Sequence, residues 1–139
     1  MKTLIATLIV GVLALVSAGN LKAQSADIIV NNDVAATSLD KAALKDILIG
    51  KTTYWPGGQA ITIVVLADKT DAALQDITGM SASQFKTHWQ RLVFSGRGQQ
   101  PKQFDDEAKL LAQVASSKGA IALVPAGTDI KGAKKIELK

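Results

Sequence analysis

Four consecutive residues, Asp68-Lys69-Thr70-Asp71, bring two carboxylates, an amine and a hydroxyl into one short polar segment. The segment lies between an expected strand and an expected helix. Free backbone N–H groups and the helix dipole make such a junction suited to anions. The carboxylate of Asp71 opposes an anion there, because like charges repel. Two readings stay open, a small-anion site and simple capping of the helix by Thr70 and Asp71, and capping is favoured.

A second polar segment, Ser95-Gly96-Arg97-Gly98, combines glycines with a guanidinium group. Glycines let backbone N–H groups approach a ligand closely, and an arginine side chain can bind a carboxylate or a phosphate through two parallel hydrogen bonds. The alternative is a glycine that ends a helix, followed by an arginine on the surface. We favour this alternative and keep Ser95, Gly96 and Arg97 as ligand-binding candidates.

The side chains needed for catalysis are sparse. The chain has one histidine, His88, and no cysteine, and no Asp or Glu near His88 has the spacing of a zinc ligand. Nothing completes a Ser-His-Asp arrangement. The acidic run Asp105-Asp106-Glu107 is typical of a helix start, and Trp55 is expected to hold its loop against the core. We therefore expect no enzyme activity, no catalytic residue, no metal site and no cofactor.

The first 25 residues have the pattern of a secretory signal peptide. Lys2 precedes an apolar run from Leu4 to Val16, which is too short for a helix that crosses a bilayer, and small residues follow it. We expect cleavage between Ala23 and Ala26 and release of a soluble protein into the periplasm. The chain has no cysteine, so neither a lipid anchor nor a disulfide is expected.

Basic residues are spread along the chain. The formal net charge is +4, and the Lys and Arg residues do not cluster apart from a thin group between Lys131 and Lys139. Proteins that bind nucleic acid usually present a clustered basic face. We therefore expect no nucleic-acid partner.

Hydrophobic periodicity predicts strands that alternate with helices. Nearly continuous apolar runs bounded by turn residues predict strands, and apolar residues at helical spacing predict helices. Thr37 and Asp40 have the spacing of a capping box for the first helix, and Ser81 is a good N-cap for the longest one. The predicted strands cover residues 27–31, 61–66, 120–124 and 136–138, the last at a sheet edge. The order β-α-β-α-α-α-β-β indicates an α/β layered fold.

Three longer phrases resemble one known family. Leu39 to Trp55 resembles the helix-Gly-Lys-turn-Trp segment of phosphate-binding proteins, which are type II periplasmic solute-binding proteins. Trp89 to Gly98, with Pro101 soon after, resembles the small stand-alone members of that superfamily. Lys118 to Pro125 is similar to the family's late strand phrase. The resemblance implies that residues 26–139 form an α/β domain equivalent to one lobe, with a mixed or parallel sheet flanked by helices.

Full receptors of this family enclose a ligand between two lobes, and this chain has room for one. The resemblance implies a small anion such as phosphate as the ligand and an ABC importer or a membrane sensor as the partner. A single lobe covers only part of a ligand, so we expect weak binding, or a site completed by a second molecule. The expected ligand-binding residues are Asp68, Lys69, Thr70, Asp71, Ser95, Gly96 and Arg97.

The family's phosphate phrase resembles Arg-Ser-Asp-Gly-Ser-Gly-Thr. When this phrase is aligned with Leu66 to Ala72, the chain retains the aspartate as Asp68 and a hydroxyl at Thr70. Leu66, Asp71 and Ala72 replace the arginine, the second glycine and the final threonine. These losses keep a second reading open. In that reading the chain is a protein-interaction or accessory module that retains the lobe fold, has lost its ligand, and acts on a membrane protein or forms a homodimer.

Overall fold

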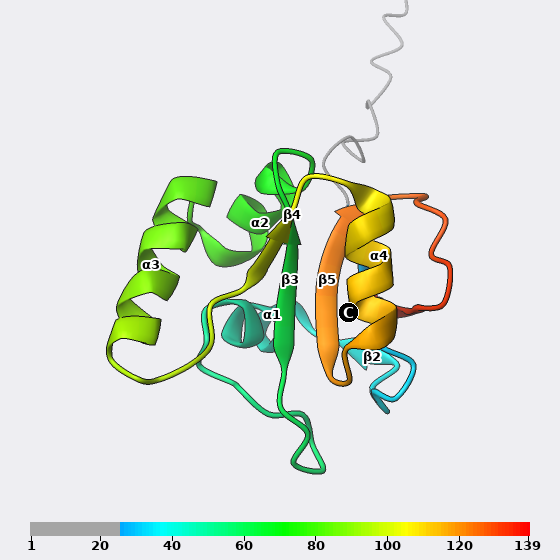
Figure 1. Cartoon of the computed structure of the whole chain (residues 1–139), viewed down its shortest axis with the longest axis horizontal. Coiled ribbons are helices and arrows are strands. Elements are labelled where there is room, and N and C mark those ends of the chain that lie inside the picture. Colours follow the sequence, from blue (N-terminus) through cyan, green and yellow to red (C-terminus); the bar gives the residue numbers. More distant parts are fainter. Residues whose placement is uncertain (1–25) are drawn as a thin grey trace, which may run out of the picture.

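The computed structural model describes residues 26–139, which form a six-stranded sheet flanked by helices (Figure 1). The strands are β1 (Ala26–Val30), β2 (Ser38–Leu39), β3 (Thr62–Leu66), β4 (Lys102–Phe104), β5 (Ala120–Pro125) and β6 (Lys134–Leu138). The helices are α1 (Lys41–Leu48), α2 (Asp71–Thr78), α3 (Ala82–Phe94) and α4 (Glu107–Ser116). The predicted signal peptide lies outside the described residues. Within residues 26–139, no helix has the length and apolar character that a bilayer crossing requires.

The sheet is mixed and has the strand order β2-β6-β1-β5-β3-β4. β1 runs antiparallel to its two neighbours, β5 and β6, whereas β3 is parallel to both β5 and β4. The prediction of an α/β layered fold with a mixed sheet is confirmed. The prediction that the last strand lies at an edge is wrong, because β2 pairs in parallel with the outer side of β6.

Two strands and one helix cap differ from the sequence prediction. β4 has the sequence Lys-Gln-Phe and its first two residues are exposed, so it carries no apolar run; β2 has only two residues. The side chain of Asp40 accepts a hydrogen bond from the Ala43 N–H at 2.6 Å and caps α1, so the helix begins later than a Thr37 cap would place it. Ser81 caps α3 as predicted, through reciprocal hydrogen bonds with Gln84.

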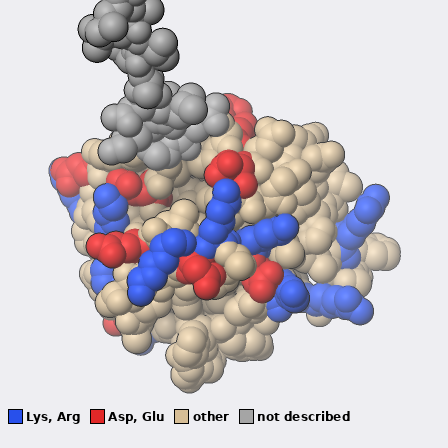
Figure 2. All heavy atoms as spheres, turned by 180° about the vertical axis from the view of Figure 1, so that it is seen from behind, with Lys and Arg blue, Asp and Glu red and all other residues tan. Residues whose placement is uncertain are grey.

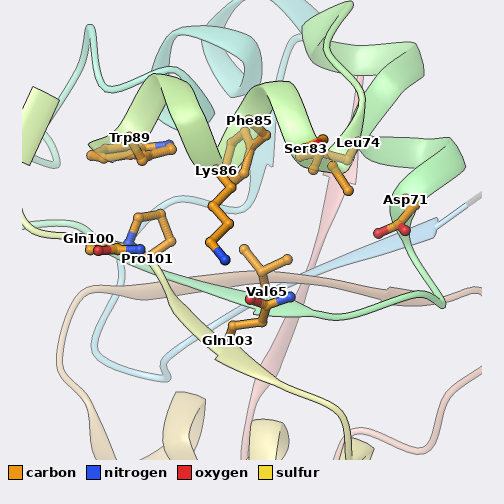
Figure 3. Close-up of a pocket in the computed structure, with 11 residues that line it drawn as sticks. Val65, Asp71, Leu74, Ser83, Phe85, Lys86, Trp89, Gln100, Pro101 and Gln103 are labelled. Atoms are coloured by element: carbon orange, nitrogen blue, oxygen red, sulfur yellow. The ribbon is translucent and has the colours of Figure 1, made fainter. Parts of the chain in front are cut away.

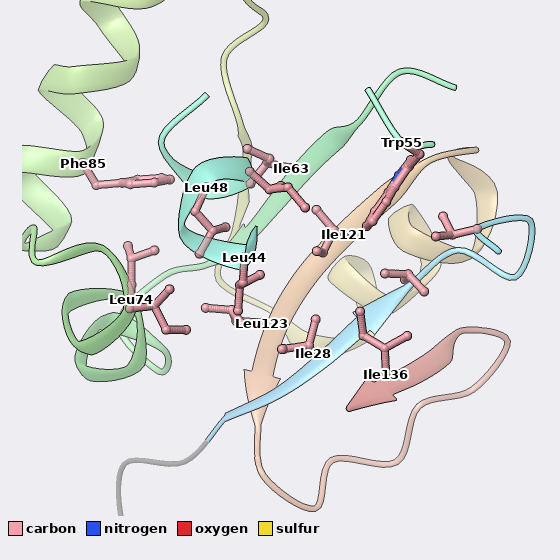
Figure 4. Close-up of a cluster of buried hydrophobic side chains, with 14 of the residues drawn as sticks. Ile28, Leu44, Leu48, Trp55, Ile63, Leu74, Phe85, Ile121, Leu123 and Ile136 are labelled. Carbon is pink, nitrogen blue, oxygen red and sulfur yellow. The ribbon is translucent and has the colours of Figure 1, made fainter. Parts of the chain in front are cut away.

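The core divides into two clusters, one on each face of the sheet, because successive side chains of a strand point to opposite faces. On β1, Ile28 and Val30 belong to one cluster and Ile29 to the other. The first cluster includes side chains of α1, α2 and α3 (Figure 4). The second is closed by Leu110 and Val114 of α4. Helices therefore cover both faces, which explains the nearly continuous apolar runs in β3 and β5.

Helix α3 is held over the C-terminal end of α1. The indole Nε1 of Trp89 donates to the carbonyl O of Leu48 at 2.9 Å, and Nε2 of His88 lies 2.7 Å from the carbonyl O of Ile49. Carbonyl groups in the last turn of a helix lack partners within the helix, so these contacts satisfy them. A Cβ at Gly50 would lie 2.9 Å from Cη2 of Trp89. The glycine thus permits the close approach that fixes the position of Trp89.

Candidate functional site

Two cavities lie beside α3, and both Trp89 and Gln100 line each of them. We name them after one basic residue in each. The Arg97 cavity has a volume of about 380 Å³, and the Lys86 cavity has a volume of about 230 Å³ (Figure 3). Both are open to solvent, as the single-lobe expectation requires. Trp89 and Gln100 are therefore shared by the two cavities.

The Arg97 cavity is formed by three segments that are distant in sequence. The turn after α1 contributes Thr52, Thr53 and Tyr54, the start of β3 contributes Thr62, and the loop between α3 and β4 contributes Gly96 and Arg97. Among residues 26–139, the charged side chains in the lining are those of Arg97 and Lys102, and both are cations. Guanidinium and ammonium groups, with hydroxyl and amide groups around them, are the donors that proteins use to bind oxyanions.

The loop that carries Arg97 is organised by the end of α3. The N–H of Gly96 donates to the carbonyl O of Val93 at 3.0 Å, and the N–H of Arg97 donates to that of Leu92 at 2.9 Å. Gly96 has a φ of 75°, a left-handed conformation that glycine adopts without strain. The helix-ending role predicted for the glycine is therefore confirmed. The N–H groups of Gly96 and Arg97 are both used by the cap, so of these two residues it is Arg97, through its guanidinium, that can meet a ligand.

Ser95 contributes to the same turn and lies outside the cavity lining. Its Oγ donates to the carbonyl O of Leu92 at 2.9 Å. This hydrogen bond closes the last turn of α3. Of the three residues predicted in this segment, Gly96 and Arg97 line the cavity and Ser95 supports the turn behind them.

The Asp68–Asp71 junction has a different geometry from the one expected. Thr70 is buried, with 3% of its surface exposed, and its Oγ1 donates to the carbonyl O of Leu66 at 2.9 Å. Thr70 stands at the N-cap position of α2 and Asp71 in its first turn, as predicted, but the side chain of Thr70 makes no hydrogen bond to the start of the helix. Asp68 has a φ of 66°, and the N–H of Lys69 donates to the carbonyl O of Ala67 at 2.8 Å. The hydroxyl of Thr70 is thus engaged in the turn.

Acidic side chains gather around this junction. The amine of Lys69 lies 3.5 Å from a carboxylate oxygen of Glu107, and the two residues share a shallow surface hollow with Asp105 and Asp106. Asp106 caps α4 by accepting hydrogen bonds from the N–H groups of the next turn, which confirms the capping role predicted for the acidic run. An anion at the junction would face these carboxylates as well as Asp68 and Asp71, and their charges oppose it.

The two predicted segments lie at opposite ends of β3. Asp68 to Asp71 follow the last residue of the strand, whereas Gly96 and Arg97 share a cavity with Ile61 to Ile63 at its start. The structure does not bring the two segments into one site. Of the junction residues, Asp71 reaches a cavity, the one that contains Lys86.

Several lining residues were missed by sequence reasoning. Lys102 reaches the Arg97 cavity from a segment that has no motif, and Tyr54 reaches it from the Leu39–Trp55 segment, in which only Trp55 was considered. Ser83, Lys86 and Trp89 follow one another at intervals of three along α3, so they lie on one helix face. That spacing is the signal that could have revealed the Lys86 cavity.

The charged surface is mixed in sign. On the face shown in Figure 2, the side chains of Lys and Arg lie among those of Asp and Glu, with no continuous basic area. Within residues 26–139, no group of His, Asp or Glu side chains is arranged to hold a metal ion.

No protein-family model matches the chain, and no curated protein matches it in sequence. Solved structures do match. A Clostridium perfringens protein described as a phosphate ABC transporter substrate-binding protein, solved with bound phosphate, is similar with a TM-score of 0.61 and 20% identity over 81% of this chain and 44% of that one. An ABC-type phosphate transport receptor from Vibrio cholerae has a TM-score of 0.55 and 19% identity over 81% of this chain and 45% of the receptor.

PstS from Borrelia burgdorferi has a TM-score of 0.55 and 12% identity, with 83% of this chain and 47% of PstS covered. This chain thus spans less than half the length of the three proteins. Identity at this level shows the fold and no more. The chain therefore has the fold of one lobe of such receptors, as the sequence resemblance implied.

Proposed function

We propose that this protein is a periplasmic solute-binding module that binds a small oxyanion such as phosphate in the Arg97 cavity. The observation that carries the proposal is the charge of the lining, whose described residues include Arg97 and Lys102 and no carboxylate. The likeness to phosphate-receptor structures supports the same ligand class. In this proposal the protein is exported, performs no chemistry, and hands its ligand to a membrane transporter or sensor.

The open cavity limits the affinity that the module can reach alone. Arg97 can form two parallel hydrogen bonds to an oxyanion, while Lys102 acts as a single positive charge. Both side chains are exposed, and ion contacts exposed to water contribute little because solvent screens them. A second molecule that covers the cavity would exclude water and strengthen both contacts. This explains how one lobe could serve a transporter or a homodimer.

Titration calorimetry of the wild-type protein with sodium phosphate and with sodium sulfate tests the proposal. We expect weak but saturable binding that becomes about two- to fivefold weaker in Arg97→Gln and in Lys102→Gln, since each variant removes one charge contact that solvent screens. Arg91→Gln is the matched control, because Arg91 is an exposed arginine of α3 that lies outside the cavity lining. Absence of saturable binding, or equal affinity in Arg97→Gln and wild type, would refute the proposal.

A second candidate function is a protein-interaction module. The end of α3 carries two exposed apolar side chains, Phe94 with 96% and Val93 with 37% of their surface exposed, and Tyr54 in the cavity lining is 61% exposed. Large exposed apolar groups are typical of protein contacts. Sedimentation velocity tests self-association through this surface. A dimer that forms in the wild type and is lost in Phe94→Ser would favour the interaction module, and a monomer at all concentrations would oppose a homodimer.

A further inference from the structure

The Lys86 cavity combines an apolar floor with one charge of each sign. Its apolar lining is Val65, Leu74, Phe85, Trp89 and Pro101. Lys86 of α3 and Asp71 of α2 supply the charges. In Figure 3 the side chain of Lys86 extends from α3 into the space above Val65, while Asp71 lies at one end of the cavity.

Asp71 and Lys86 do not form an ion pair with each other. Among residues 26–139, the ion pairs join other residues, and neither Asp71 nor Lys86 takes part in one. By contrast, Lys69 pairs with Glu107 just beyond the same end of β3. Opposite charges that face one apolar space without pairing are complementary to a ligand that carries both charges and an apolar body.

The walls of the cavity are firmly held. Leu74, Phe85 and Trp89 have 2%, 5% and 4% of their surface exposed, and the indole of Trp89 is fixed by its hydrogen bond to Leu48. The volume of about 230 Å³ is below the roughly 300–1,000 Å³ of sites for drug-sized ligands, so the ligand must be small. Val65 and Asp71 place the cavity beside the carboxyl end of β3, the region where open α/β sheets commonly bind ligands.

We propose that the Lys86 cavity binds a small zwitterion with an apolar body, such as an amino acid with an apolar side chain. The ammonium group of the ligand faces the carboxylate of Asp71, and its carboxylate faces the amine of Lys86. The hydroxyl of Ser83 and the amide of Gln103 supply neutral hydrogen-bonding groups in the lining. The apolar body covers Phe85 and Leu74. This site is separate from the Arg97 cavity and does not depend on anion binding there.

Calorimetric titration with matched probes tests the site. L-Leucine and 6-aminohexanoate each carry both charges at different separations, whereas hexanoate and hexylamine each carry one. We expect saturable binding of at least one zwitterion and about two- to fivefold weaker binding of both singly charged probes, because each of these makes one of the two charge contacts. Binding of a singly charged probe as tight as that of the best zwitterion would overturn the proposal, as would no saturable binding of either zwitterion.

Three variants assign the binding to this cavity. Lys86→Met keeps the aliphatic stem and removes the charge, and Asp71→Asn keeps the shape of the carboxylate; each is expected to weaken zwitterion binding about two- to fivefold. Lys45→Met is the control, because Lys45 is an exposed helical lysine outside the lining. Unfolding curves verify that the variants are folded. Unchanged zwitterion binding in Lys86→Met would refute the site, and Arg97→Gln is expected to leave zwitterion binding unchanged whatever its effect on phosphate.

Discussion

The indole Nε1 of Trp55 donates a hydrogen bond to the carbonyl O of Gly119 at 2.9 Å, across 64 residues of sequence. The same carbonyl accepts a hydrogen bond from the N–H of Thr62 at 3.2 Å. Trp55 is buried, with 5% of its surface exposed, which confirms the core role predicted for it. The turn that contributes Thr53 and Tyr54 to the Arg97 cavity is therefore fixed to the beginning of β5.

Replacing Trp55 by phenylalanine is expected to lower the free energy of unfolding by about 1–2 kcal/mol, because one buried hydrogen bond is lost while the Gly119 carbonyl keeps its second donor. Urea denaturation followed by circular dichroism measures the change. Tyr54→Phe is the control, since Tyr54 is 61% exposed and should change stability little. Equal effects of the two substitutions would contradict this role of Trp55.

Gly119→Ala is expected to destabilise the fold severely. A Cβ at Gly119 would lie 2.1 Å from the carbonyl O of Ala60, and its φ is +76°. Gly127 has a φ of +82° with no atom within 4 Å of a built Cβ. Gly127→Ala should therefore cost only the left-handed strain of about 1–2 kcal/mol, and Gly119→Ala should cost clearly more. Thermal unfolding of both variants compares their losses of stability. A smaller loss in Gly119→Ala than in Gly127→Ala would contradict the prediction.

Asn31→Ala is expected to cost about 2–3 kcal/mol, because two carbonyl groups lose their donor in a buried site. Asn31 is 4% exposed, and its Nδ2 donates to the carbonyl O of Val114 at 2.8 Å and to that of Ala115 at 3.0 Å. These contacts join the end of β1 to α4. The neighbouring Asn32 is exposed and donates to Gly132, so Asn32→Ala is the control in the same urea experiment. A loss in Asn32→Ala as large as in Asn31→Ala would count against this contact.

Asp40→Ala is expected to reduce stability by about 1 kcal/mol, the usual cost of losing an N-cap side chain. Thr37→Ala should leave stability nearly unchanged, because the side chain that caps α1 belongs to Asp40. Urea unfolding of the two variants separates the alternatives. A larger loss of stability in Thr37→Ala than in Asp40→Ala would support Thr37 as the cap of α1, as the sequence pattern indicated.

Asp71→Asn is expected to leave phosphate affinity unchanged, because Asp71 and Arg97 line different cavities. If the anion instead binds at the Asp68–Asp71 junction, removal of this carboxylate will strengthen phosphate binding by lowering the repulsion. Calorimetric titration with phosphate, run beside Arg97→Gln, distinguishes the two places. Tighter phosphate binding in Asp71→Asn, together with unchanged binding in Arg97→Gln, would indicate that the anion binds at the Asp68–Asp71 junction.

Features that depend on neighbouring residues could be predicted from the sequence. Ser81 and Gln84 form the expected capping box, and the apolar run of β3 is a buried strand. The start of α1 could not be predicted in this way. The carbonyl O of Thr37 accepts the N–H of Glu137, and that of Leu39 accepts the N–H of Lys139. Residues 38 and 39, which the local pattern assigns to the helix, therefore pair with β6 as strand β2.

The same limit applies to the candidate sites. Gly96 and Arg97 could be identified because glycine and arginine are adjacent in the sequence. Lys102 and Tyr54 could not, because they reach the cavity only after the edge strand β4 and the turn held by Trp55 are in place. Lys86 was missed because an exposed lysine on a helix has no distinctive pattern until the sheet beneath it defines a cavity.

Trp89 lines both the Arg97 cavity and the Lys86 cavity. A ligand in either cavity would change the surroundings of its indole, so the fluorescence emission of Trp89 should respond to both kinds of ligand. Trp55 is buried in the core and lines neither cavity. Binding of phosphate or of a zwitterion is therefore expected to change the tryptophan fluorescence of the protein, without a label.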